Sequence, residues 1–190
     1  VVICCSRMDE ILEVDTENRI AVVQPGVVNA HLSQAVVSSG LFYAPDPSSQ
    51  QACTIGGNVA ENSGGPHTLK NGVTTNHVLG FEMVLPDGTV EWLGARPDGG
   101  EDVPGYDLRG AAIGCEGMFG VITRVLVRLM KKPNSFKTFL GIFESVDEIT
   151  KANWILNAGP NQPLDRLEDY EEVLVQAVSM GLPMLCANPD

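Results

Sequence analysis

The feature that most constrains this chain is a run of small residues, PDPSSQQACTIGGNVAENSGG, at residues 45–65. It holds two prolines and four glycines, and it is too long for an ordinary turn. Because glycine lacks a Cβ, a backbone rich in glycine can approach its neighbours closely. The fold must therefore bring this run against something, either an element of the chain itself or a ligand.

Within the run, Thr54 is predicted to cap a short helix whose first turn contains Gly56 and Gly57. Backbone N–H groups at such a helix start attract phosphate or another electron-rich group. Asn58 and Asn62 add amide donors and acceptors, so the composition favours a large, partly anionic and partly planar ligand over a metal. Packing of a small-residue helix on a sheet explains the composition equally well, and the usual nucleotide motifs are absent.

Turn residues predict most of the other elements. Strands are expected on both sides of the turn at 16–18, on both sides of the turn at 86–88, and in VITRVLVRLM before Pro133. A helix is expected from Asn29, as its cap, to Gly40, with an inner stripe formed by Leu32, Ala35 and Val36.

The chain opens on VVICCSRMDE, which is read as a strand entered midway, with Cys4 and Cys5 in the core. This start has no basic segment and no initiator methionine, so it is not a signal peptide. We therefore expect the 190 residues to be an internal piece of a longer protein. No apolar run approaches the length of a transmembrane helix.

The pattern changes after Lys131-Lys132-Pro133. FKTFLGIF predicts a strand, and helices are predicted over 145–159, with a capping box, and over 163–181. These elements indicate a second domain of α/β character at 134–190, after a first domain at 1–133. The acidic run at 165–172 has helical spacing, which is typical of a solvated face.

Charge and cysteine content exclude several classes of protein. The net charge is −12 and no basic stripe is visible, which disfavours nucleic acid as a partner. The five cysteines are odd in number and include no C-x-x-C, so we expect reduced thiols in a cytosol-like compartment. His67 and His77 lack the spacing of a helical metal pair, and no metal site is predicted.

Three long motifs resemble the FAD-linked oxidase family, which is part of the vanillyl-alcohol-oxidase-like (PCMH-type) FAD-binding superfamily. They are PDPSSQQACTIGGNVAENSGG, GVTTNHVLGFEMVLPDGTV and PGYDLRGAAIGCEGMFGVIT, in the order and spacing of the family, across roughly residues 1–145. The branch is that of the bacterial glycolate oxidase flavoprotein subunit and D-lactate dehydrogenase. The family's upstream pyrophosphate loop has no counterpart here.

The resemblance implies a set of cofactor-binding positions. The PDPSS motif places Pro45, Asp46, Pro47 and Ser48 along the flavin. The TIGGN motif places Cys53, Thr54, Gly57 and Asn58 near the isoalloxazine or ribityl group, and Gly64 approaches through its backbone. The third motif places Glu116, Gly117 and Val121 around the FAD, with Val121 acting through its main chain.

Some residues depart from the family pattern. Cys53 stands where relatives have another small residue, and CEGMF at 115–119 replaces the usual Ser-Glu-Gly-Thr-Leu. The change from Ser to Cys weakens hydrogen bonding, and the change from Thr to Met removes a hydroxyl, which would loosen FAD binding while sparing backbone contacts. His67 either points at the flavin or substrate or is a solvated loop residue.

The implied fold is α+β: the second lobe of a two-lobed FAD-binding domain, an antiparallel sheet with flanking helices, followed by the start of a cap domain. The implied function is FAD-dependent oxidation of a small 2-hydroxy acid to the 2-oxo acid, with electrons passing to an acceptor or an iron–sulfur partner subunit. The alternatives are another alcohol substrate or a non-catalytic flavin-fold subunit. No catalytic residue is assigned, because the family's His/Glu metal cluster has no match in this chain.

Overall fold

The computed structural model describes residues 3–99, 105–133, 136–142 and 172–178. The chain divides into two compact units, residues 1–132 and 133–190. Each unit is described by itself.

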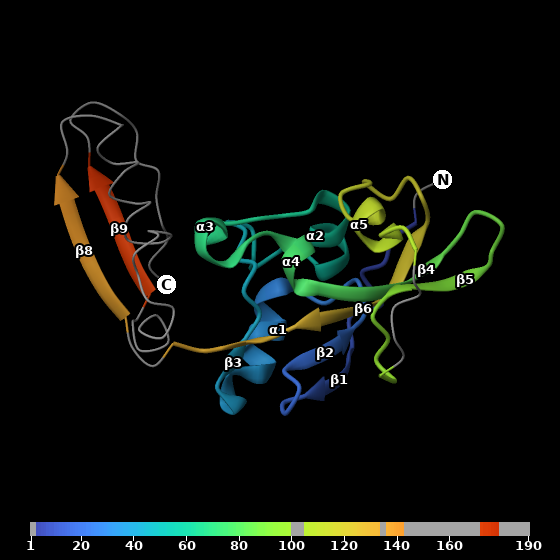
Figure 1. Ribbon diagram of the computed structural model, residues 1–190, viewed down its shortest axis with the longest axis horizontal. Coiled ribbons are helices and arrows are strands. Elements are labelled where there is room, and N and C mark those ends of the chain that lie inside the picture. The colour runs from blue at the N-terminus through green and yellow to red at the C-terminus, as the bar shows by residue number, and fades with distance from the viewer. Residues whose placement is uncertain (1–2, 100–104, 134–135, 143–171, 179–190) are drawn as a thin grey trace. The chain divides into compact units, whose positions relative to one another are not determined.

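The first unit is built on a five-stranded antiparallel sheet with the order β1-β2-β6-β4-β5. The strands are β1 (Ile11–Asp15), β2 (Ile20–Val23), β4 (Val78–Val84), β5 (Val90–Gly94) and β6 (Val121–Arg128). The two predicted hairpins are confirmed, and Leu85 N–H donates to Thr89 O at 2.8 Å across the second turn. Strand β6 lies at the centre, between the two hairpins (Figure 1).

Helices pack on this sheet and enclose the core. They are α1 (Asn29–Val36), α2 (Ile55–Glu61) and α5 (Leu108–Ala112). The core consists of apolar side chains from the strands and these helices, among them Val23, Leu32, Ile55, Val59, Phe81, Met83, Val125 and Val127. Alternate residues of a strand point to the same face, which is why Val125 and Val127 of β6 both join this core, whereas the equally buried Leu126 does not. The predicted α+β class is confirmed.

Short elements join these larger ones. They are the 3₁₀ turn η1 (Val37–Ser39), the paired strands β3 (Leu41–Phe42) and β7 (Met130–Lys131), and the single-turn helices α3 (Thr68–Asn71) and α4 (Thr74–His77). Gly40 ends η1 with φ 68°, the left-handed conformation that glycine adopts freely. The predicted end of this helical segment is therefore confirmed.

Two details of the α1 prediction are wrong. The residue before the helix is Val28, and Asn29 is instead a buried helical residue. The amides of Asn29 and Ala30 donate to the carbonyls of Cys53 and Gln50, both at 3.0 Å, so the start of α1 needs no side-chain cap. Ala35, placed on the inner stripe, is exposed, whereas Leu32 and Val36 are buried as predicted.

The opening strand is also a wrong prediction for the residues described. Residues 3–10 form no strand, Cys4 is exposed and Cys5 is only half-buried. The segment turns instead, because Met8 N–H donates to Cys5 O at 2.9 Å and Gly26 N–H donates to Met8 O at 2.7 Å. Its carbonyls lie where a Cβ on Gly26 would be, which explains that glycine.

The second unit is described through two strands, β8 (Phe136–Ile142) and β9 (Glu172–Val178), which pair in parallel from Phe136 opposite Glu172 to Ile142 opposite Val178. Strand β8 was predicted. The helix predicted over 163–181 is wrong at residues 172–178, where the β-branched Val173, Val175 and Val178 favour a strand. The helix predicted over 145–159, the acidic run before Glu172 and Cys186 lie outside the described residues.

Within the described part of the chain, no helix has the length and hydropathy needed to cross a bilayer.

Candidate functional site

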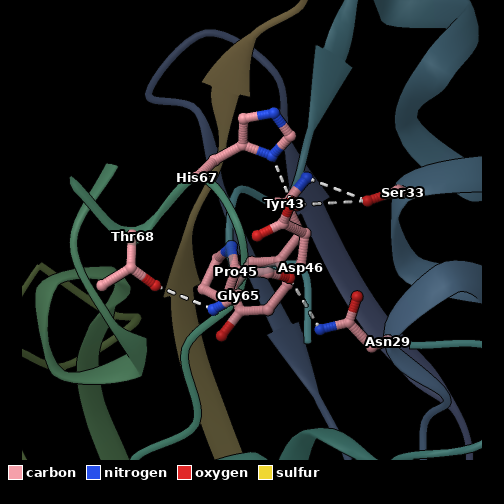
Figure 2. Close-up of polar contacts among 8 residues, drawn as sticks. All are labelled: Asn29, Ser33, Tyr43, Pro45, Asp46, Gly65, His67 and Thr68. Atoms are coloured by element: carbon pink, nitrogen blue, oxygen red, sulfur yellow. Dashed lines mark hydrogen bonds and ion pairs between the residues drawn. The ribbon is translucent and has the colours of Figure 1, made fainter. Parts of the chain in front are cut away.

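Helix α1 anchors the start of the small-residue run. Ser33 Oγ accepts the Tyr43 N–H at 3.1 Å, and Asn29 Nδ2 donates to Pro45 O at 3.0 Å (Figure 2). Asn29 is only 1% exposed, so its amide needs this partner. The burial of Asn29, which sequence analysis took for a cap, therefore serves to fix the backbone just before Asp46.

The run then coils on its way to α2. Gln50 N–H donates to Pro47 O and Cys53 N–H donates to Ser49 O, both at 2.8 Å. An isolated β-bridge between Val28 and Thr54 follows. Pro45 and Pro47 are buried, whereas Ser48 is exposed. We call residues 45–48 the corner: its two prolines pack against the protein, and its last residue faces solvent.

Thr54 caps α2 as predicted, with its Oγ1 accepting the Gly57 N–H at 3.2 Å. The expectation that the N–H groups at this helix start are free for a phosphate is wrong. Ile55 N–H donates to Val27 O and Gly56 N–H donates to Pro25 O, both at 2.8 Å. The amides of the first three helical residues are thus all used inside the protein.

The four glycines of the run differ in what a Cβ at each position would contact. A Cβ on Gly56 would lie 2.6 Å from Pro25 Cβ, and one on Gly64 would lie 2.7 Å from Thr68 Oγ1. A Cβ on Gly65 would overlap Asp46. These three glycines serve packing. At Gly57 the described residues offer only Thr54 Oγ1, 3.3 Å away, and Gly57 is exposed. Internal packing therefore leaves the absence of a side chain at Gly57 unexplained.

Asn58, the next residue of α2, carries a buried polar atom without a protein partner. The residue is 1% exposed, and its Nδ2 has no hydrogen-bond acceptor among the described residues. Burying an unpaired amide costs about 1–3 kcal/mol. A donor of this kind, one residue along α2 from the exposed Gly57, suits a ligand with hydrogen-bond acceptors.

The second glycine-rich segment lies against the later part of α2. Gly114 N–H donates to Val59 O at 2.8 Å, and Glu116 N–H donates to Ala60 O at 2.9 Å. Glu116 and Gly117 have φ of 53° and 75°, and both are exposed, as are the apolar side chains of Met118 and Phe119. The structure thus brings Glu116 and Gly117 to the helix that carries Gly57 and Asn58.

Val121 takes a different place among the predicted site residues. It opens β6 opposite Val84, and it is half-buried. Cys53 and Thr54 are half-buried at the start of α2. The predicted residues therefore fall on three connected pieces of one unit: the corner at 45–48, the start of α2, and the segment from Glu116 to Val121.

Sequence analysis missed several polar partners of these pieces. Asp46 Oδ2 contacts His67 Nδ1, and Tyr43 packs edge to face on His77. No local sequence motif could have predicted either contact, because the two residues of each pair are 21 and 34 positions apart in the sequence. Among the described residues no group of three or more histidine, cysteine or acidic side chains could hold a metal ion.

The sheet carries a helix start with an exposed glycine, followed by a buried amide that has no partner among the described residues, and together these make a candidate cofactor site. The open face of Gly57 and the unpaired Asn58 Nδ2 fit FAD, whose flat ring needs close approach and whose ring edge offers acceptors. Asn58 would donate a hydrogen bond to the group, and Gly57 would leave room for it.

Comparisons with known proteins agree. Residues 1–94 match the model of the FAD binding domain family. The chain is 46% identical over 147 residues to the glycolate oxidase subunit GlcD of Bacillus subtilis, covering 77% of this chain and 31% of that protein. It is 36% identical over 148 residues to a D-lactate dehydrogenase of Anaerostipes hadrus, covering 78% and 30%. The chain thus spans about a third of the length of these curated relatives.

A solved structure of an alkyldihydroxyacetonephosphate synthase has the same fold, with a TM-score of 0.58 and 25% identity over 68% of this chain and 23% of that one. Residues 1–94 of the chain are an FAD binding domain, and FAD is the cofactor of that domain.

Proposed function

We propose that this chain is part of an enzyme that uses FAD to oxidise a small 2-hydroxy acid, of the glycolate or D-lactate type, to the 2-oxo acid. The names of both curated relatives support this substrate class. The structural observation that supports cofactor binding is an exposed Gly57 followed by Asn58, whose buried Nδ2 has no partner among the described residues. Bound FAD would supply the hydride acceptor.

The residues of this chain bind and orient the cofactor. The corner at Pro45–Ser48 forms one wall, and Thr54 fixes the start of α2 through its bond to Gly57 N–H. Cys53 belongs to the same wall, as does Gly64 through its backbone, and Glu116, Gly117 and Val121 line the other side, with Val121 acting through its main chain. Two exposed apolar side chains nearby, Met118 and Phe119, would cover an apolar ligand surface.

We further propose that residues 1–133 are the C-terminal lobe of the FAD-binding domain and that residues 134–190 begin the substrate or cap domain. The division of the chain at Lys132 supports this boundary. The electron acceptor or an iron–sulfur subunit is the proposed partner. We propose a cytoplasmic location, with any membrane contact made through that partner; the odd number of cysteines supports a reducing compartment.

The test uses the intact protein, purified and loaded with FAD. Glycolate and D-lactate are added without oxygen, and the loss of the oxidised flavin absorption is followed. Both acids should bleach the flavin, whereas ethanol and 1-propanol, which lack the carboxylate, should not. A protein that takes up FAD but is bleached by neither acid would be a flavin-fold subunit without this activity, or would act on another alcohol.

A further inference from the structure

Two loops of the candidate site are joined by a pair of side chains distant in sequence. Asp46 lies in the corner after Pro45, and His67 lies in the loop before α3. His67 Nδ1 contacts Asp46 Oδ2, and the two side chains are 22% and 21% exposed (Figure 2). Because a carboxylate only accepts hydrogen bonds, Nδ1 carries the donated proton. The pair is sheltered enough to be screened less by solvent than an exposed ion pair.

The backbone on both sides of the Asp46–His67 pair is closely packed and hydrogen-bonded. A Cβ on Gly65 would overlap the carbonyl and the carboxylate of Asp46, so Asp46 occupies the space beside Gly65. Gly65 N–H donates to Thr68 Oγ1 at 2.8 Å, which fixes the second loop to the start of α3. On the other side, Asn29 holds Pro45 O. The corner is thus fixed to α1 on one side and to residues 65–68 on the other.

The charge of Asp46 also bears on its role. One carboxylate oxygen contacts His67, and the other lies where a Cβ of Gly65 would be. A carboxylate without a partner would place an unbalanced negative charge beside the proposed flavin site, and burying such a charge is costly. The hydrogen bond from His67 stabilises the carboxylate and directs one of its oxygens toward the protein.

We propose that Asp46 and His67 are positioning residues, which clamp the corner at 45–48 to the loop at 63–68 in the arrangement that receives FAD. Asp46 then acts on FAD affinity through His67 and not by its own contact with the cofactor. The inference rests on the proposed function, since it needs a flavin at this site.

A double-mutant cycle tests the clamp. FAD is titrated into the apo form of the intact protein for the wild type, Asp46→Ala, His67→Ala and the double variant. Each single change should weaken FAD binding about tenfold, and the double variant should lose clearly less than the product of the two single losses, because both changes remove the shared contact. Asp46→Asn keeps an oxygen that accepts the Nδ1 proton, and it should restore most of the lost affinity.

His31→Ala, at an exposed position of α1, is the matched control and should leave FAD affinity unchanged. Circular dichroism establishes that each apo variant is folded. Should an alanine variant fail to fold, Asp46→Asn and His67→Gln supply a milder cycle with the same expected non-additivity. Alanine variants that bind FAD like the wild type, or losses that multiply in the double variant, overturn the clamp. A wild-type protein that binds no FAD overturns the proposed function itself, and does so before any variant is compared.

Discussion

Tyr43 and His77 meet edge to face, with ring centroids 6.3 Å apart and an angle of 77° between the planes. Both are almost fully buried, at 2% and 3% exposed. His77 Nε2 donates to Asn71 O at 2.7 Å, so the proton of the neutral ring sits on Nε2. His77 Nδ1 has no hydrogen-bond partner among the described residues. The Tyr43 hydroxyl faces Thr74 without a hydrogen bond of good geometry, and burial raises the pKa of Tyr43.

The first prediction concerns acid stability. Burial lowers the pKa of His77 below its ordinary value of 6.5, with the Asn71 bond opposing this effect and the charge of Arg128 adding to it. The unfolded state therefore takes up a proton near that pH while the folded state does not. Stability should fall as the pH drops through 6.5, by at most about 1.4 kcal/mol per pH unit from this group.

Urea unfolding at about pH 7.5 and about pH 5.5 measures this effect. His77→Gln should shrink the difference in unfolding free energy between the two conditions. His31→Gln, at an exposed position, should leave it unchanged. An equal pH dependence in wild type and His77→Gln would contradict the prediction.

The second prediction concerns Gly57. Gly57→Ala should change the stability of the apo protein by no more than about 1 kcal/mol, because the helix preference of alanine is opposed by a tight contact of its Cβ with Thr54 Oγ1, 3.3 Å away. The same change should weaken FAD binding, and Gly57→Val should weaken it about tenfold or more, as a Cβ fills the space left for the ligand. FAD titration and urea unfolding of each variant separate the two effects.

The control for Gly57→Val needs a position with ordinary backbone geometry. Gly99, in a surface turn, has φ 77°, so valine there would be strained for reasons unrelated to a ligand. Ala35→Val, on the exposed side of α1, is the better match because it places the same side chain in a helix. Unchanged FAD affinity in Gly57→Val would mean that Gly57 serves packing like Gly56.

The third prediction concerns Asn58. Asn58→Leu removes a buried amide that lacks a partner, so the apo protein should gain about 1 kcal/mol in unfolding free energy. FAD affinity should fall about tenfold, since a donor to the cofactor is lost. Thermal unfolding with and without FAD measures both changes. A variant that is less stable without FAD would show that Nδ2 already has a partner in the apo protein.

The fourth prediction concerns the cap of α2. Thr54→Ala should cost about 1 kcal/mol of stability, because the Gly57 N–H loses its acceptor. Thr54→Ser keeps the hydroxyl and should recover most of that loss. Urea midpoints of the two variants provide the comparison, and equal midpoints would mean that the hydroxyl contributes nothing.

Local patterns predicted the parts of this fold whose causes are local. The turn at 86–88 lies between two apolar strands, and Thr54 stands just before a helix, so each could be read from neighbouring residues. The start of α1 could not, because its amides bond to Gln50 and Cys53, which lie about twenty residues further on. A polar residue at a helix start has the same appearance whether it caps or, like Asn29, is buried.

The candidate site was predicted from motifs, and it stays a prediction. Family motifs led to the positions of Gly57, Asn58 and Glu116, which the structure brings onto one helix and its neighbour. The α2 amides donate to the carbonyls of Pro25 and Val27. These are tertiary contacts, so the motif alone could not predict that the amides are already used. The misread strand at 172–178 is another case, since a short, nearly continuous apolar run interrupted only by Gln176 fits either period.

The central place of β6 sets the order in which this unit can be completed during synthesis. The β1–β2 and β4–β5 hairpins each close locally, but neither touches the other in the finished sheet, because β6 lies between them. Residues 121–128 must leave the ribosome before the two hairpins can be joined into one sheet, because both pair with β6. Until then each hairpin exposes an unpaired edge, and the nascent chain is at its most vulnerable to chaperone capture or misassembly. The same strand starts at Val121, so the ligand site is among the last features of the unit to exist.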